Sequence, residues 1–171
     1  MLALQENEFA PYQQPYLDAV ENKDKGIIEN LEDSLEKLLQ LLKNLPKEKQ
    51  LYNYAEDKWT IKELIQHIID CERVFAYRTL CFARKDKTHL PGFEQDDYMA
   101  NYDSNSRIFE DLINEFVFVR NSTILMFKSF DAEILKSLGI ASGYSQSVRA
   151  LGYIIAGHQL HHTNIIKERY L

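Results

Sequence analysis

The sequence has no cluster of basic residues, only two cysteines and no long apolar run. Its 26 acidic residues outnumber its 20 lysines and arginines, which argues against nucleic-acid binding because that function needs a basic patch. Cys71 and Cys81 form no C-x-x-C pair, and so few cysteines suit a reducing compartment. No stretch approaches the roughly 20 apolar residues of a membrane-spanning helix, and residues 1–16 lack a signal-peptide pattern. We therefore expect a soluble, cytoplasmic protein that binds neither nucleic acid nor membrane.

Glycine and proline are also scarce, with six and four residues in a chain of 171. Together with an apolar fraction of 45%, this composition is typical of a globular protein rich in helix. The length predicts one domain over residues 1–171. Pro11 and Pro15 fall in residues 1–24, and we expect this N-terminal segment to be irregular and to wrap around the domain.

Apolar residues recur at steps of three and four along most of the remaining chain, which is the pattern of amphipathic helices. The clearest helix start is at Thr60, where Glu63 three residues later completes a capping box. No segment shows the alternation of a half-buried strand. The sequence therefore predicts an all-α protein, an up-and-down four-helix bundle, with helices over residues 26–42, 60–83, 104–130 and 146–169.

Residues 84–104 form a long polar connection between the second and third predicted helices. Connections of this length in compact proteins are often lids or binding edges. Trp59, Phe93 and Tyr98 are candidates for the mouth of a pocket near it. The alternative is that these aromatic rings only cover the ends of the core.

Three of the five histidines fall within the six-residue stretch GHQLHH of the fourth predicted helix. Steps of four and three residues from Leu151 to Ile165 pass through His158 and His162, which places both on one core seam. His161 lies roughly 70° off that seam, because each helical residue turns about 100°. We therefore expect His158 and His162 to point into the bundle and His161 to lie on its flank.

Two imidazoles one helical turn apart, about 6 Å along the axis, can bind a single divalent ion. A catalytic site also needs a ligand from another element and an open position for a reactant. His67, at the edge of the apolar face of the second helix, is the candidate for that ligand, whereas His89 falls in the long connection. A hydrogen-bonded core histidine is the commoner role for any one of them alone, so spacing leaves both interpretations open.

Cys71 and Glu72 are further candidates on the second helix. Cys71 lies one turn beyond His67, so it is either a fourth ligand or a small buried thiol. Glu72 falls on the apolar face, where a carboxylate needs a partner such as Arg78 or Arg149. Its functional role would be that of a general base or a partner of a metal ligand. For both residues the structural interpretation is the commoner one.

Three stretches of the chain resemble the DinB-like superfamily of bacterial four-helix bundles. They are EFAPYQQPYLDAV at 8–20, KWTIKELIQHIIDCERVFAYRTLCFARKDKTHLPGFEQDDY at 58–98 and SVRALGYIIAGHQLHHTNIIKERYL at 147–171. The likeness is greatest to the bacillithiol-transferase-like branch, whose members are described as metal-dependent hydrolases. It rests on the histidine of the second helix, the LPGF loop and the GHxxHH helix, and it implies a four-helix bundle that forms a homodimer.

The resemblance also implies a metal triad, with one histidine on the second helix and an H-x-x-x-H pair on the fourth. In this chain these are His67, His158 and His162, and the implied metal is zinc or nickel. Two positions depart from the family pattern. Cys71 stands where a small or polar residue is usual, and His89 stands where proline is expected.

Three neutral histidines leave the double positive charge of a bound ion uncompensated. Such an ion acidifies a coordinated water and favours a coordinated thiolate over the thiol. The predicted function is therefore a divalent-metal-dependent enzyme acting on a small-molecule substrate, either as a hydrolase or as an S-transferase that uses a low-molecular-weight thiol. The resemblance slightly favours the transferase. The alternatives are a non-catalytic metal-binding or stress-response bundle and a helical interaction protein with a hydrogen-bonded histidine cluster.

Overall fold

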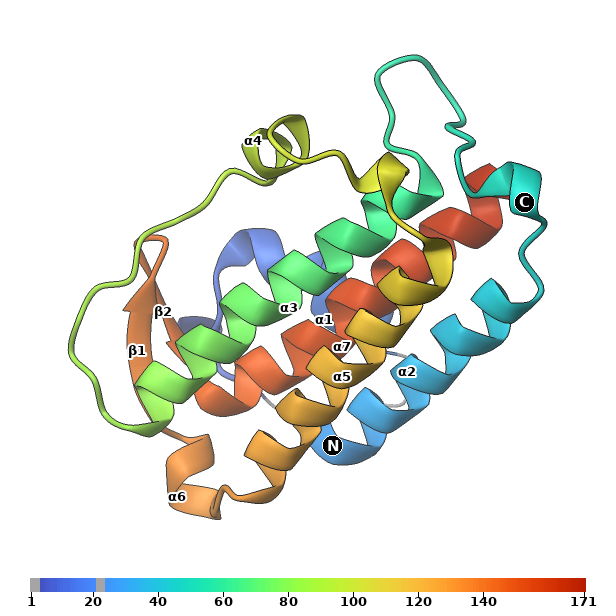
Figure 1. The fold of residues 1–171 in the computed structure, drawn as a ribbon. Coiled ribbons are helices and arrows are strands. Elements are labelled where there is room, and N and C mark those ends of the chain that lie inside the picture. Colours follow the sequence, from blue (N-terminus) through green and yellow to red (C-terminus); the bar gives the residue numbers. More distant parts are fainter. Residues whose placement is uncertain (1–3, 21–23) are drawn as a thin grey trace.

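Four long helices form the body of the computed structural model, which describes residues 4–20 and 24–171 (Figure 1). The prediction of an all-α four-helix bundle is confirmed. The capping box is present, because the Thr60 hydroxyl accepts a hydrogen bond from the backbone N–H of Glu63 and the Glu63 carboxylate accepts one from that of Thr60. None of the described helices is long and apolar enough to cross a membrane. The four helices are α2 (Ile27–Lys43), α3 (Ile61–Ala83), α5 (Phe109–Lys128) and α7 (Val148–Ile165).

Shorter elements connect and cover the bundle. The helix expected to continue to residue 169 changes from α-helix to a π-helical turn, and the helix expected to start near residue 104 begins with a separate 3₁₀ turn. The short helices are α1 (Gln14–Ala19), α4 (Gln95–Ala100), α6 (Ala132–Leu135) and the π-helical η5 (Ile166–Tyr170), and the 3₁₀ turns are η1 (Glu6–Glu8), η2 (Pro11–Gln13), η3 (Lys47–Lys49) and η4 (Ser104–Ser106).

The N-terminal segment expected to be irregular is partly helical, which corrects the prediction. Pro11 and Pro15 stand in the first turns of η2 and α1, where a residue without an N–H is tolerated because that group has no helical partner. The prolines therefore start these turns, and α1 packs against α7. Residues 1–3 and 21–23 of the segment lie outside the described residues.

A small β-hairpin is a further difference from the prediction, which included no strand. Strands β1 (Leu138–Ala141) and β2 (Tyr144–Ser147) pair antiparallel, with Leu138 opposite Ser147 and Ala141 opposite Tyr144. The two turn residues, Ser142 and Gly143, have φ values of 52° and 81°, as in the two-residue turns of tight hairpins. Strands this short show no readable alternation, so only the Ser-Gly turn signals them.

The helix directions differ from strict alternation, because α3 and α5 run parallel. The Lys62 ammonium at the start of α3 donates hydrogen bonds to the carbonyls of Asn105 and Arg107, just before α5. The start of α2 lies instead near the end of α5, where Glu32 pairs with Lys128 at 2.9 Å. The connection after α3 spans the length of the bundle before α5 begins (Figure 1), so the four helices run up, down, down and up.

The apolar core is divided into two clusters along the bundle axis. One cluster contains Leu31 of α2 and Ile124 of α5, and the other contains Leu38 and Phe116 of the same two helices. Buried polar residues occupy the level between the clusters on all four long helices. They are Ser34 on α2, Glu72 on α3, Arg120 on α5 and Gln159 on α7.

Arg120 links this polar layer together. Its side chain is 0% exposed, and its guanidinium donates to both oxygens of the Glu72 carboxylate at 2.9–3.1 Å. It also donates to the Leu31 carbonyl, the Ser34 hydroxyl and the Gln159 side-chain oxygen. The expectation that Glu72 pairs with Arg78 or Arg149 is therefore wrong, since Arg149 pairs with Glu8. Arg78 donates to the Pro91 carbonyl and the Ser142 hydroxyl.

The Arg120→Met variant should lose roughly 3–5 kcal/mol of unfolding free energy, because it leaves the Glu72 carboxylate buried without a partner. Adding Glu72→Leu should restore much of that loss, since it removes the buried charge. Urea denaturation followed by circular dichroism measures both. The matched control is Lys128→Met, in the exposed pair with Glu32, which should lose less than about 1 kcal/mol. Equal losses in the two single variants would contradict this account.

Candidate metal centre

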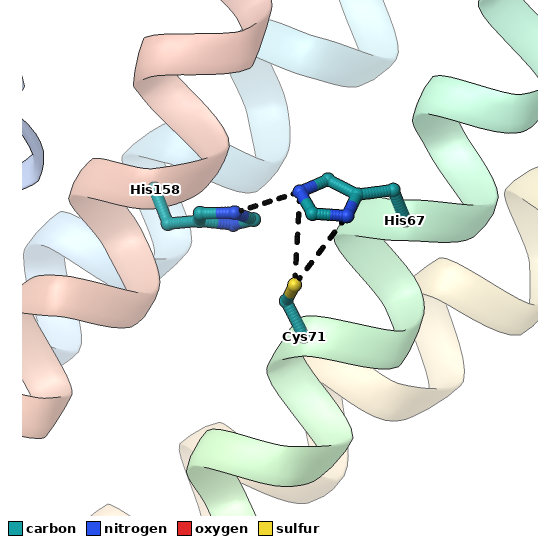
Figure 2. Close-up of side chains that lie close together, drawn as sticks. All are labelled: His67, Cys71 and His158. Carbon is teal, nitrogen blue, oxygen red and sulfur yellow. Dashed lines mark hydrogen bonds between the residues drawn. The ribbon is translucent and has the colours of Figure 1, made fainter. Parts of the chain in front are cut away.

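Three imidazole nitrogens converge between α3 and α7. His67 Nε2 lies 3.1 Å from His158 Nε2 and 3.2 Å from His162 Nε2, and the last two lie 3.2 Å apart. His158 and His162 are one turn apart on α7, and His67 faces them from α3, as Figure 2 shows for His67 and His158. The prediction that His158 and His162 point inward from α7 agrees with this placement.

The three rings are neutral in the folded protein. Burial lowers the pKa of His67 to about 4. Burial first, and then the neighbouring histidine rings, lower the pKa values of His158 and His162 well below the ordinary range. Each Nε2 atom therefore carries either one proton or one lone pair. A single Nε2–H can donate to one neighbouring nitrogen, which leaves the third nitrogen unsatisfied, whereas a cation accepts three lone pairs at once.

The nitrogen spacing fits a divalent ion. Two nitrogen ligands of tetrahedral zinc, with Zn–N bonds of about 2.0–2.1 Å, lie roughly 3.3–3.4 Å apart. The three observed distances of 3.1–3.2 Å are within a few tenths of an ångström of that value. Neutral histidine is also the protonation state that metal binding requires.

Cys71 belongs to the same buried cluster. Its Sγ atom and one nitrogen each of His67 and His158 all lie within 4.8 Å of one another, so these three residues could hold a metal ion (Figure 2). The sulfur lies 3.6 Å from both ring nitrogens of His67. Equal distances place it beside the ring rather than in line with the Nε2 lone pair, so ligation by Cys71 requires its side chain to turn. Burial raises the pKa of this thiol far above its usual range.

Glu72 is held away from the three rings by its ion pair. Both carboxylate oxygens accept hydrogen bonds from Arg120, and the side chain is 2% exposed. No hydrogen bond between Glu72 and a histidine is found within residues 4–20 and 24–171. The structure thus favours the structural role of Glu72, and its role as a base stays a prediction.

The N-terminal helix α1 covers one side of the histidine cluster. The Tyr16 ring packs edge-on against His158 and His161, with ring centroids 5.0 and 5.6 Å apart. This approach depends on Gly157, because a Cβ atom there would lie 1.9 Å from the Tyr16 carbonyl oxygen. His161 lies on the flank of α7 under this cover, as predicted, and His89 is exposed in the connection after α3.

A cavity of about 530 Å³ reaches the cluster at His162, and Trp59 also lines it. The Trp59 ring also packs on His67, with centroids 4.7 Å apart. The expectation that Trp59 lies at the mouth of a pocket agrees with this placement. Tyr98 instead lines a separate groove beside α4, where Phe93 contacts it at a centroid distance of 5.4 Å.

The fold and the site together define a helical bundle with a candidate metal centre between two facing helices. Residues 30–166 match the DinB superfamily, so the chain belongs to that superfamily. A comparison with curated proteins finds no match.

One solved structure similar to this chain is YfiT from Bacillus subtilis, described as a probable metal-dependent hydrolase with an unusual four-helix bundle topology. The TM-score is 0.72 at 12% sequence identity, over 97% of this chain and 90% of YfiT. At this level of identity the comparison shows a shared fold.

The metal-free protein should lose stability as the pH falls from about 6.5 to about 4. Between these values the unfolded chain binds protons at histidines that the folded state keeps neutral, so the free energy of unfolding decreases as the pH is lowered. The shift of His67 from an ordinary value near 6.5 to about 4 corresponds to on the order of 3 kcal/mol. Urea denaturation of chelator-treated protein across this range measures the slope, and His67→Gln should reduce it. If the unfolding free energy of His67→Gln depended on pH as steeply as that of the wild type, the pH dependence could not be attributed to His67.

Proposed function

We propose that this protein is a divalent-metal-dependent enzyme acting on small molecules, with His67, His158 and His162 as the ligands of one ion. The observation that carries the proposal is the convergence of three neutral imidazole nitrogens within 3.1–3.2 Å of one another. A bound zinc or nickel ion would supply Lewis acidity toward a coordinated water or thiol.

The cavity beside His162 supports an enzyme over a purely structural metal site. Structural zinc sites are closed by four protein ligands, whereas catalytic sites keep a position open for a reactant. Three histidines leave such a position, and the cavity gives a small molecule access to one of them. The non-catalytic metal-binding bundle is the alternative, in which Cys71 would close the coordination sphere.

The surrounding residues would hold the reactants in a dry site. Tyr16 packs against His158, and Trp59 packs on His67. The ion pair of Glu72 with Arg120 fixes the rotation of α3 just beyond His67 and Cys71. Exclusion of water strengthens electrostatic interactions inside such a site.

Two reaction types fit this arrangement, and each has its own support. The resemblance to thiol transferases supports S-transfer, in which a substrate thiolate attacks an electrophilic carbon. The structural similarity to YfiT, described as a probable metal-dependent hydrolase, supports hydrolysis. Monobromobimane or chlorodinitrobenzene with a panel of thiols tests the first reaction, and ester and amide substrates test the second.

The His158→Ala variant should bind less than about 0.2 equivalents of zinc, while the wild type binds about one, because it lacks one of three ligands. Elemental analysis of protein purified without a histidine tag measures this, and turnover should disappear with the metal. The matched control is His161→Ala on the same helix, which should retain the metal and most activity. Activity in metal-free His158→Ala protein with native helicity would rule out this mechanism.

Cobalt(II) substitution distinguishes a site with three histidine ligands from one in which Cys71 is a fourth ligand. A thiolate ligand adds an intense charge-transfer absorption in the near ultraviolet. We expect cobalt-loaded wild type to lack that band, with Cys71→Ser retaining cobalt affinity, and His162→Ala to lose affinity. A thiolate band in the wild type that disappears in Cys71→Ser would assign Cys71 as a ligand and contradict a site with three histidines and an open position.

The homodimer implied by the family resemblance stays a prediction, because the structure describes a single chain. Exposed apolar side chains on α5, with Phe118 73% and Leu125 69% exposed, offer one surface for it.

A further inference from the structure

The cavity beside His162 combines aromatic walls with acidic groups. Tyr54, Trp59 and Tyr170 line it together with Asp57 and Asp96. These residues come from three separate parts of the chain: the loop before α3, α4, and the C-terminal turn η5. The lining therefore brings together two kinds of group that attract positive charge.

The aromatic walls meet at a corner. The Tyr54 and Tyr170 rings pack edge to face, with centroids 5.0 Å apart and planes at 84°, and both residues line the cavity. The Tyr170 hydroxyl donates a hydrogen bond of 2.6 Å to the Trp59 carbonyl, which fixes the third aromatic residue relative to this corner. Several aromatic faces around one space are the usual arrangement for binding organic cations such as quaternary ammonium groups.

The carboxylates of the lining are unneutralised. Neither Asp57 nor Asp96 has an ion-pair partner among the residues that the structure describes. Lys58 is the opposing charge in the lining, so two carboxylates face one ammonium. The connection that carries Asp96 adds to the negative field, because residues 88–106 contain four acidic residues and no lysine or arginine.

A histidine of the cavity lining also carries a buried polar atom without a partner. The Nδ1 atom of His162 is buried and has no hydrogen bond, although His162 lines the cavity. An unsatisfied buried polar atom is unfavourable, so the hydrogen bonding of His162 is incomplete in this structure. The cavity thus has an apolar and anionic outer part and a polar end at the histidines.

We propose that this cavity binds a small organic cation, a molecule with an ammonium group between Tyr54, Trp59 and the two carboxylates and a metal-seeking group at the histidines. The inference rests on the proposed metal site and adds the substrate class. An anionic small molecule, including a thiol that carries carboxylates, would meet the unneutralised Asp57 and Asp96 on entry and bind less well.

The test uses cobalt-loaded protein and three short thiols that differ in charge: thiocholine, 2-mercaptoethanol and 3-mercaptopropionate. The quaternary ammonium of thiocholine cannot coordinate the metal, so its effect on affinity reports on the cavity. Dissociation constants come from the thiolate-to-cobalt absorption band. We expect thiocholine to bind at least about 5-fold more tightly than 3-mercaptopropionate, with 2-mercaptoethanol between them, and we expect added salt to narrow the difference.

Variants separate the effect of the cavity from the different acidities of the thiols. The dissociation constant of 3-mercaptopropionate divided by that of thiocholine is the ratio to compare. The double variant Asp57→Asn with Asp96→Asn should reduce this ratio by about 5-fold, because both carboxylates are lost. Tyr54→Leu should weaken thiocholine binding, whereas Tyr54→Phe, which keeps the ring face, should not. Glu133→Gln, on α6 at the far end of the bundle (Figure 1), is the matched charge control and should leave the ratio unchanged.

Equal affinities for the three thiols, or a ratio that the double variant leaves unchanged, would overturn this inference while leaving the metal site intact. Failure of the wild-type protein to bind cobalt would overturn the proposed function and the inference with it. Tighter binding of 3-mercaptopropionate than of thiocholine would reverse the proposed substrate class.

Discussion

The buried ion pair between Glu72 and Arg120 is the contact on which the rest of the structure depends. The Arg120 guanidinium is completely buried and donates hydrogen bonds to residues of all three other long helices. Since a buried charge is tolerated only with a well-placed partner, the pair fixes how α3 is rotated against α5. Cys71 precedes Glu72, and His158 precedes Gln159 on α7, so the same network fixes the helices that carry the candidate ligands.

The histidine cluster follows from that arrangement. With α3 and α7 held at one level, three rings from two helices meet with their Nε2 atoms 3.1–3.2 Å apart. Burial keeps the rings neutral, which is the protonation state that metal binding requires. Helix α1 covers the cluster at His158, and the cavity reaches it at His162; the proposed metal site needs such an accessible position.

The sequence predicted the elements that carry a strong local signal and missed those set by tertiary contacts. The capping box at Thr60 located the start of α3, and the seam through His158 and His162 placed both rings correctly. The partner of Glu72 was missed, although Arg120 lies four residues from both Phe116 and Ile124, a spacing that marks it as buried. The hairpin and the parallel course of α3 and α5 leave no periodic pattern, because the path of a long connection is decided by packing. The cavity beside His162 likewise joins residues far apart in the chain.

The most direct test of the central claim is anomalous diffraction at the zinc edge from crystals grown with zinc. We expect one anomalous peak at about 2.0–2.2 Å from the Nε2 atoms of His67, His158 and His162, with electron density for a non-protein ligand on the side of the cavity. A zinc-loaded crystal whose histidine nitrogens stay in mutual contact with no peak between them, or whose peak lies elsewhere, would contradict the account.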